Sequence, residues 1–154
     1  MVGIVILIIA AVIGISVGIY SKVQKSNMMA SGDIIERSTK DLTKKAEIFT
    51  TKIKDLQEIY EVLKNTDLVN QKINMEYSAG MIRFTKNRMI TSLTKQGEGR
   101  YRLCVDKYIV TRTNGIKTGT NNTLEMNLIF TAVEKAILRL DYYAEVEEEF
   151  VKRV

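Results

Sequence analysis

The chain has 154 residues, of which 45% are hydrophobic and 27% charged, with a net charge of +5. That length is about one domain's worth, and the composition is that of a globular protein, so disorder is not the default expectation. The sequence contains no histidine and a single cysteine. Imidazole-based catalysis, histidine-ligated metal sites and an intramolecular disulfide are therefore excluded.

The first predicted element is a membrane-spanning helix from Val2 to Tyr20, which contains no charged residue. At 1.5 Å per residue it is about 28 Å long, close to the thickness of a hydrocarbon core. Lys22 and Lys25 follow it, and no basic residue precedes it. The asymmetry predicts a single-pass anchor over residues 1–21, with the N-terminus outside and the C-terminal domain in the cytoplasm. A cleaved signal peptide is the alternative, but the basic region that such a peptide needs before its apolar run is missing.

Three small residues of this segment, Ala10, Gly14 and Gly18, are spaced four apart. This spacing places them on one helix face, where small side chains let a second helix approach closely. The pattern makes this face a candidate for helix pairing, and a lipid-facing coincidence is the alternative.

After a polar neck over residues 22–32, we expect a soluble α+β domain over residues 33–154. Its first element is a predicted long amphipathic helix over residues 33–64, begun by Asp33 with Glu36 at the third position. Apolar residues alternate at steps of three and four along a seam over residues 35–63. Either the domain itself or the same helix of a second copy would cover this seam.

From Gly80 the apolar period changes to two, and β-branched and aromatic residues become frequent. These features predict strands, and Asn114-Gly115 predicts a two-residue hairpin turn. Residues 83–90 and 102–109 share a strand–turn–strand pattern. Two hairpins in series would give a small antiparallel meander of about four strands.

The last predicted element is a C-terminal helix packed on this sheet. Asn122 is its expected cap, with Glu125 at the third position, and apolar residues follow at steps of three and four as far as Ala144. The glutamates from Glu145 to Glu149 are interpreted as a solvated face.

No residue pattern indicates catalysis, a cofactor or a metal site. The Gly-x-Gly of residues 97–99 precedes a strand rather than a helix, which favours a tight turn over a phosphate loop. Cys104 lacks a histidine base and is interpreted as structural.

Basic residues of the predicted strands form a candidate basic sheet surface, whose expected partner is anionic lipid headgroups. Phe84 and Tyr101 interleave with these basic residues as nucleic-acid platforms do, but the predicted anchor argues against that partner. The candidate surface consists of Arg83, Arg88, Arg100, Arg102 and Lys107.

An N-terminal apolar helix followed by an antiparallel sheet resembles the topology of type IV pilins and pseudopilins. That family has a basic leader and usually a glutamate at the fifth mature position, whereas Gly3 is followed here by the apolar residues 4–8. The function we predict is a membrane-anchored, non-enzymatic interaction or scaffold protein. The alternatives are an extracytoplasmic pilin-like assembly subunit and an enzyme with an unrecognised site.

Overall fold

The structure is a computed structural model that describes residue 20 and residues 22–151. The chain divides into two units, Met1–Ile35 and Glu36–Val154. Most of the predicted anchor, including the candidate pairing face Ala10, Gly14 and Gly18, lies outside the described residues. Among the helices that are described, none is long and apolar enough to cross a membrane.

In the first unit, residues 22–30 of the predicted neck are helical. The helix ends at Ala30, and in the turn that follows Gly32 has a φ of 77°, which is readily adopted only without a Cβ. The amide of Asp33 then donates to the Met28 carbonyl at 2.8 Å, which satisfies one of the last carbonyls of the helix.

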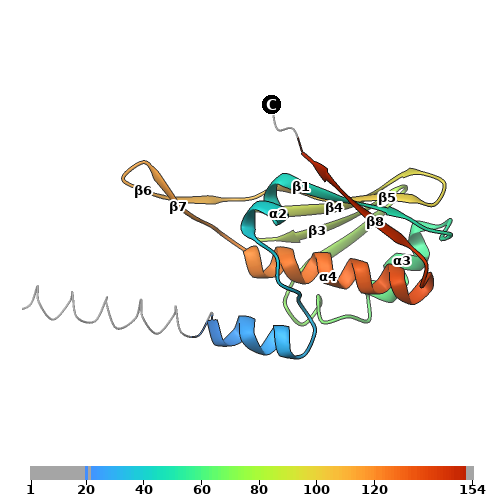
Figure 1. The fold of residues 1–154 in the computed structure, drawn as a ribbon, viewed down its shortest axis with the longest axis horizontal. Coiled ribbons are helices and arrows are strands. Elements are labelled where there is room, and N and C mark those ends of the chain that lie inside the picture. Colours follow the sequence, from blue (N-terminus) through green and yellow to red (C-terminus); the bar gives the residue numbers. More distant parts are fainter. Residues whose placement is uncertain (1–19, 21, 152–154) are drawn as a thin grey trace, which may run out of the picture. The chain divides into compact units, whose positions relative to one another are not determined.

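The second unit is an α+β fold on a six-stranded antiparallel sheet (Figure 1). The strand order is β2-β3-β4-β5-β1-β8, while β6 and β7 form a separate two-stranded sheet. The elements are α2 (Thr39–Lys44), β1 (Lys45–Thr50), α3 (Leu56–Leu63), β2 (Asn74–Ser78), β3 (Met81–Lys86), β4 (Met89–Gly97), β5 (Arg100–Lys107), β6 (Val110–Thr113), β7 (Ile116–Thr120), α4 (Thr123–Leu140) and β8 (Glu145–Phe150).

The predicted class, the antiparallel meander and the C-terminal helix packed on the sheet are confirmed. The meander consists of β2 to β5, joined by consecutive turns. The first expected hairpin is β3–β4, but the second does not form, because β5 and β6 belong to different sheets. The Asn114-Gly115 turn joins β6 to β7, with φ values of 51° and 80° as such a turn requires.

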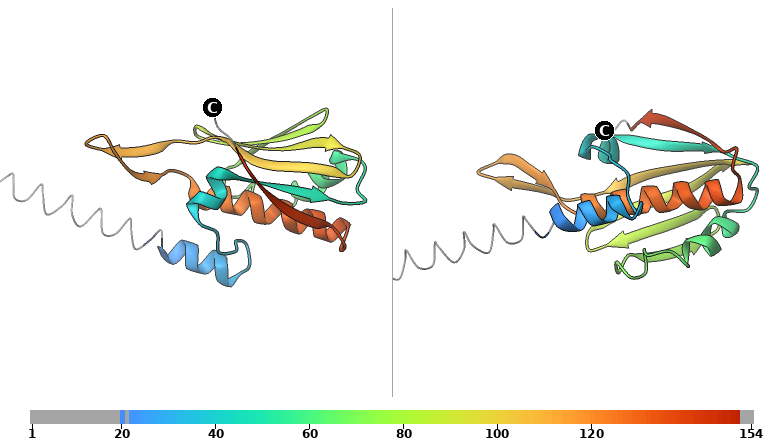
Figure 2. Two further views of the ribbon diagram at one scale, coloured as in Figure 1. Left: turned by 45° about the horizontal axis from the view of Figure 1, so that its top comes forward. Right: turned by 60° about the horizontal axis from the view of Figure 1, so that its bottom comes forward.

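The core lies between the sheet and helices α3 and α4, which cover one of its faces (Figure 2). Its largest fully buried aromatic side chains are Phe49, Phe84, Tyr101 and Phe130. Burying an apolar side chain of this size contributes about 1.5–3 kcal/mol. The Tyr101 hydroxyl also donates to the Ile53 carbonyl at 3.0 Å, so its polar end is satisfied inside the core.

The long helix predicted for residues 33–64 is wrong, because this stretch forms α2, β1 and α3. Ser38 begins α2 in place of Asp33, and its hydroxyl accepts from the Asp41 amide. Asp55 begins α3, where its carboxylate accepts from the Gln57 amide. Most apolar residues of the expected seam are buried, but they belong to different elements, and Ile35 at its start is exposed. No continuous helical seam therefore exists over residues 35–63 for a coiled coil.

Two details at the C-terminal end also differ from expectation. Asn122 precedes α4 in a left-handed conformation, with φ of 61°, and its side chain makes no capping hydrogen bond. Residues Glu145–Phe150 are a strand and not the end of a helix. They alternate acidic and apolar side chains in part, and they pair along the whole length of β1.

Candidate anion-binding site

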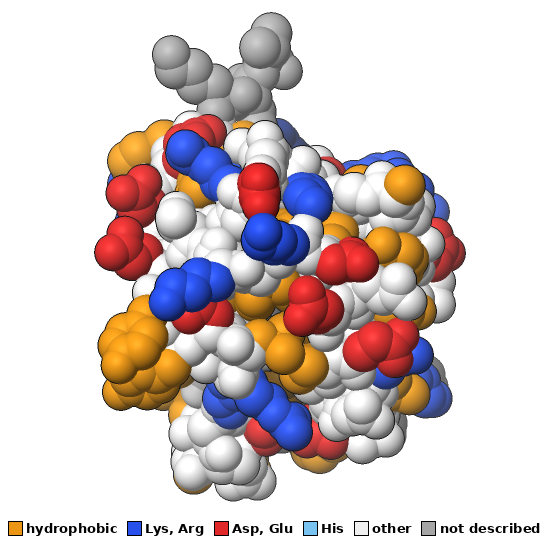
Figure 3. Space-filling model, turned by 90° about the vertical axis from the view of Figure 1, so that its right-hand side faces the viewer, with side chains coloured by type: hydrophobic (Ala, Val, Ile, Leu, Met, Phe, Trp, Pro, Cys, Tyr) orange, Lys and Arg blue, Asp and Glu red, His pale blue; other side chains and the backbone are white. Residues whose placement is uncertain are grey.

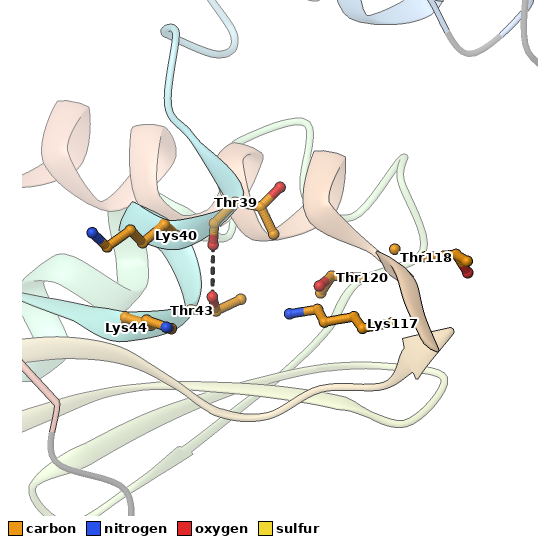
Figure 4. A pocket seen from close by; sticks show the side chains of 8 residues that line it. Thr39, Lys40, Thr43, Lys44, Lys117, Thr118 and Thr120 are labelled. Atoms are coloured by element: carbon orange, nitrogen blue, oxygen red, sulfur yellow. Dashed lines mark hydrogen bonds between the residues drawn. The ribbon is translucent and has the colours of Figure 1, made fainter. Parts of the chain in front are cut away.

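A hollow of about 400 Å³ lies between α2 and β7 (Figure 4). This volume falls in the range of small-molecule sites. Its lining contains only hydroxyl groups, ammonium groups and one glycine. The lining residues are Thr39, Lys40, Thr43, Lys44, Lys117, Thr118, Gly119 and Thr120.

The α2 side of the hollow repeats a Thr-Lys pair four residues apart, at 39–40 and 43–44, which places like residues on the same helix face. The Thr43 hydroxyl donates to the Thr39 carbonyl at 2.7 Å. The one carboxylate of α2, Asp41, accepts from Ser38 and pairs with Lys45 at 3.0 Å. These hydrogen bonds, from Ser38 first and then from Lys45, lower the pKa of Asp41 to about 2.

On the β7 side, the Lys117 side chain extends toward α2, where Thr43 and Lys44 lie (Figure 4). The Thr120 hydroxyl oxygen is buried and has no hydrogen-bond partner in the structure. A buried hydroxyl without a partner costs about 1–3 kcal/mol. An anionic oxygen placed in the hollow would relieve this cost by accepting its hydrogen bond.

The three lysines of the hollow, Lys40, Lys44 and Lys117, make no ion pair with any described carboxylate. The lining itself carries no acidic side chain. The positive charge of the hollow is therefore left without a nearby counter-charge in the described part of the chain. Such an arrangement favours binding of an anion.

A second polar cluster is buried under the N-terminal half of α4. The Arg37 guanidinium pairs with Glu47 of β1 at 3.3 Å and with Glu134 of α4 at 2.6 Å. Its other nitrogen donates to Asn127 and Thr131, each at 2.9 Å. The side chains of Arg37 and Glu47 are only 8% and 9% exposed, so water has little access.

Glu47 is the strained member of this cluster. Burial, and then the neighbouring Glu134 carboxylate, raise the pKa of Glu47 to about 8, although Arg37 opposes the shift. One oxygen of Glu47 has no hydrogen-bond donor nearby. A proton on that carboxyl would supply a donor for Glu134, so one guanidinium and one net carboxylate charge would then balance. The cluster is closed and self-compensated, which is typical of a structural element.

The candidate basic sheet surface is only partly assembled. The strand register places Arg83, Arg100 and Arg102 on the sheet face opposite to α4. Arg88 lies in the β3–β4 turn, and Lys107 ends β5 opposite Ile90, beyond an irregularity in the register. Arg102 is also engaged, since it lies 3.8 Å from Glu149 and donates to the Cys104 sulfur.

Cys104 is buried, as expected for a structural cysteine. Its thiol donates to Asp106 at 3.2 Å, and burial is the main cause of a raised pKa. A thiol with a raised pKa stays protonated at neutral pH and is a weak nucleophile.

The aromatic residues considered for nucleic-acid stacking, Phe84 and Tyr101, are both fully buried on the α4 side of the sheet. They offer no platform to a base. Within the described residues no group of three potential metal ligands is found. On the side of the domain where α4 ends, described side chains of both charges are interspersed (Figure 3).

Sequence reasoning missed both polar sites. The hollow leaves a signal, namely the repeated Thr-Lys pair and the Lys-Thr-Gly-Thr run of residues 117–120. The buried cluster leaves none, because its members are up to 94 residues apart and each looks like an ordinary surface residue. No protein family model, curated protein or solved structure matches the chain.

Proposed function

We propose that the protein is a membrane-tethered, non-enzymatic interaction module whose domain binds phosphate-bearing anions in the hollow between α2 and β7. One observation carries the binding part of this proposal. The Thr120 hydroxyl, buried and without a partner among the described residues, lines a hollow whose three lysines pair with no described carboxylate. The tether rests on the uncharged segment from Val2 to Tyr20.

The chemistry of the lining favours an oxyanion. Ammonium groups act as strongly hydrated point charges that donate hydrogen bonds, and phosphate is a common partner of such groups. Threonine hydroxyls add donors that can adjust their direction. The hollow is larger than one phosphate group needs, so the ligand would carry an organic substituent, such as the headgroup of an anionic lipid.

The predicted membrane topology agrees with this ligand. A domain on the cytoplasmic side faces a leaflet that carries anionic lipids, where each lysine or arginine near the surface contributes about 1 kcal/mol. Eighteen residues, 21–38, separate Tyr20, at the end of the apolar segment, from Thr39 at the start of α2. Protease treatment of sealed cells tests the orientation, since digestion of the domain from outside would contradict it.

Thermal unfolding of the full chain in neutral detergent tests the ligand. Inorganic phosphate, added at constant ionic strength, should raise the melting temperature by mass action. The double variant Lys44→Gln/Lys117→Gln should lose this response. Lys54→Gln/Lys64→Gln is the matched control, because it removes the same charge from exposed lysines elsewhere. Equal responses in both variants would mean a general ionic effect and would exclude the hollow.

A second measurement separates a lipid headgroup from a soluble phosphate compound. The full chain is placed in nanodiscs of zwitterionic lipid, with or without anionic lipid, and amide hydrogen exchange is followed. Protection of α2 and β7 that appears only with anionic lipid supports the headgroup. Protection that needs free phosphate in both kinds of nanodisc assigns the hollow to a soluble ligand.

A further inference from the structure

No described strand pairs with the outer edge of β8, so one edge of the six-stranded sheet is open in the described part of the chain. β8 is the last strand in the order, and all six of its residues are exposed. The Val151 amide donates to the Lys44 carbonyl at 2.8 Å, in register with the β1–β8 pairing. Hydrogen-bonded positions alternate along an antiparallel pair. The backbone groups of Val146, Glu148 and Phe150 therefore point away from β1, toward a position that no described strand occupies.

The hairpin formed by β6 and β7, here called the arm, is the second unusual feature. It forms its own two-stranded sheet and projects away from the six-stranded sheet (Figures 1 and 2). Most of its side chains are exposed, and Ile116 is 72% exposed. An isolated two-stranded hairpin is marginally stable in water, so an arm of this kind gains stability when another strand pairs with it.

The two features are complementary in charge. β8 contains four glutamates and no basic residue, whereas the arm contains Arg112 and Lys117 and no acidic residue. Glu148 already pairs with Lys45, and Glu149 lies near Arg102. Glu145 and Glu147 make no ion pair with a described residue.

Apolar exposure also matches on the two sides. Val146 and Phe150 of β8 are 43% and 65% exposed, and Ile116 of the arm is the most exposed aliphatic side chain of the described residues. A symmetric β8–β8 contact would instead place glutamates opposite glutamates, which is unfavourable. The charge pattern thus favours contact between unlike surfaces.

We propose that the arm of one molecule adds as a strand to the β8 edge of a second copy, with β6 as the pairing strand. β6 is the free edge of the arm, because β7 borders the basic hollow. The contact joins two different surfaces, so its repetition gives an open head-to-tail row. This inference goes beyond the proposed anion binding and does not depend on it.

Disulfide trapping of the full chain in detergent tests the geometry. In a Cys104→Ser background, one variant carries Thr113→Cys on the arm and another carries Val146→Cys on the edge. Neither variant alone should form a cross-linked dimer, whereas their mixture should, and a chain with both changes should give a ladder. Cross-linking of the edge variant with itself would show a symmetric β8–β8 contact and overturn the proposal. Absence of cross-links in the mixture would overturn it as well.

Charge exchange tests the same contact without cysteines. Light scattering of the unaltered chain should show particle mass growing with concentration, and Arg112→Glu should abolish this growth. Combining Arg112→Glu with Glu145→Arg and Glu147→Arg should restore the growth, because attraction returns with the signs exchanged. Arg139→Glu, an exposed change on α4, is the control and should leave the rows intact. Loss without restoration, in a variant whose circular dichroism stays native, counts against the arm–edge contact. All these variants keep Lys117 of the hollow. Loss of the head-to-tail contact can therefore be distinguished from loss of anion binding.

Discussion

The domain contains two polar sites built around basic residues. The basic charge is compensated by carboxylates in one site and uncompensated in the other. In the buried cluster, the Arg37 guanidinium meets two carboxylates and two neutral acceptors within 3.3 Å. In the hollow between α2 and β7, three lysines and a buried hydroxyl meet no described acid at all. The first site compensates its charge internally, and the second has no counter-charge among the described residues.

The difference separates a structural site from a binding site. A buried charge must be compensated when the chain folds, because an unpaired ion in a low dielectric is very costly. A half-open hollow can leave its charge to water until a ligand arrives. Changes in the buried cluster should therefore alter stability, and changes in the hollow should alter ligand response.

The largest expected effect is that of Arg37→Ala. Removing the guanidinium leaves Glu47 and Glu134 facing each other without a counter-charge, and breaking a buried pair in this way costs about 3–5 kcal/mol of unfolding free energy. Chemical denaturation at pH 7 measures the loss. Arg139→Ala, an exposed arginine of the same helix-bearing domain, should change stability by less than about 0.5 kcal/mol. A similarly small loss for Arg37→Ala would mean that the cluster is not compensated as described.

Glu47→Gln should change how stability depends on pH. The folded protein holds the Glu47 proton up to about pH 8, whereas the ordinary value of 4.5 applies to the unfolded chain. Unfolding therefore releases a proton between these values, and Glu47 makes the free energy of unfolding fall by about 1.4 kcal/mol per pH unit as pH rises.

The glutamine variant carries no proton to release and should lose this slope between pH 5 and pH 8. The free energy of unfolding of this variant should therefore fall less as pH rises. The glutamine amide can donate a hydrogen bond to Glu134 in place of the carboxyl proton. Urea unfolding at several pH values measures both slopes. Asp41 and Asp141, whose pKa values are lowered by hydrogen bonds, contribute below this window and do not interfere. Identical slopes in the two proteins would show that Glu47 is ionised in the fold.

Thr120→Val should give the smallest effect, with opposite signs for stability and binding. The valine is nearly isosteric and removes a buried hydroxyl that lacks a partner, so the ligand-free domain should gain about 1 kcal/mol. The phosphate-dependent rise in melting temperature should become smaller. Thr66→Val is the control, because Thr66 lies outside the hollow and its hydroxyl already donates to the Leu63 carbonyl at 2.7 Å. A destabilised Thr120→Val variant would mean that its hydroxyl is satisfied in solution.

The sequence predicted the sheet better than the region before it, for a physical reason. In β3 the buried Ile82 and Phe84 flank the exposed Arg83, and in β5 large apolar residues alternate with more polar ones, so the period of two is visible in the sequence. β1 is a central strand with neighbours on both sides, and its residues 46–49 are all buried. A strand buried on both faces loses its alternation, and its apolar residues fitted a helical period by coincidence.

Neither polar site could be derived in full from one sequence. Arg37 reaches Thr131 across 94 positions, and only the packing of α4 on the sheet brings them together. The Thr120 hydroxyl, which has no hydrogen-bond partner among the described residues, lies where β7 runs beside α2, shortly before a left-handed residue at Asn122. One sequence shows neither feature. The Asp55 cap of α3 was visible in principle, since it precedes an apolar run, and would have divided the supposed long helix.

The place of β1 between β5 and β8 has a consequence for how the protein is made. Lys45 of β1 meets Glu148 of β8, which is 103 positions later in the chain. During synthesis β1 emerges early, at about 5–20 residues per second, and its second neighbour emerges only seconds later. Until then one edge of a buried strand is open to other chains, and the pairing that closes it is among the most distant in the fold. Because this pairing is so distant in sequence, we expect the domain to fold late and slowly. The unpaired edge of β1 is then most exposed to aggregation before β8 has left the ribosome.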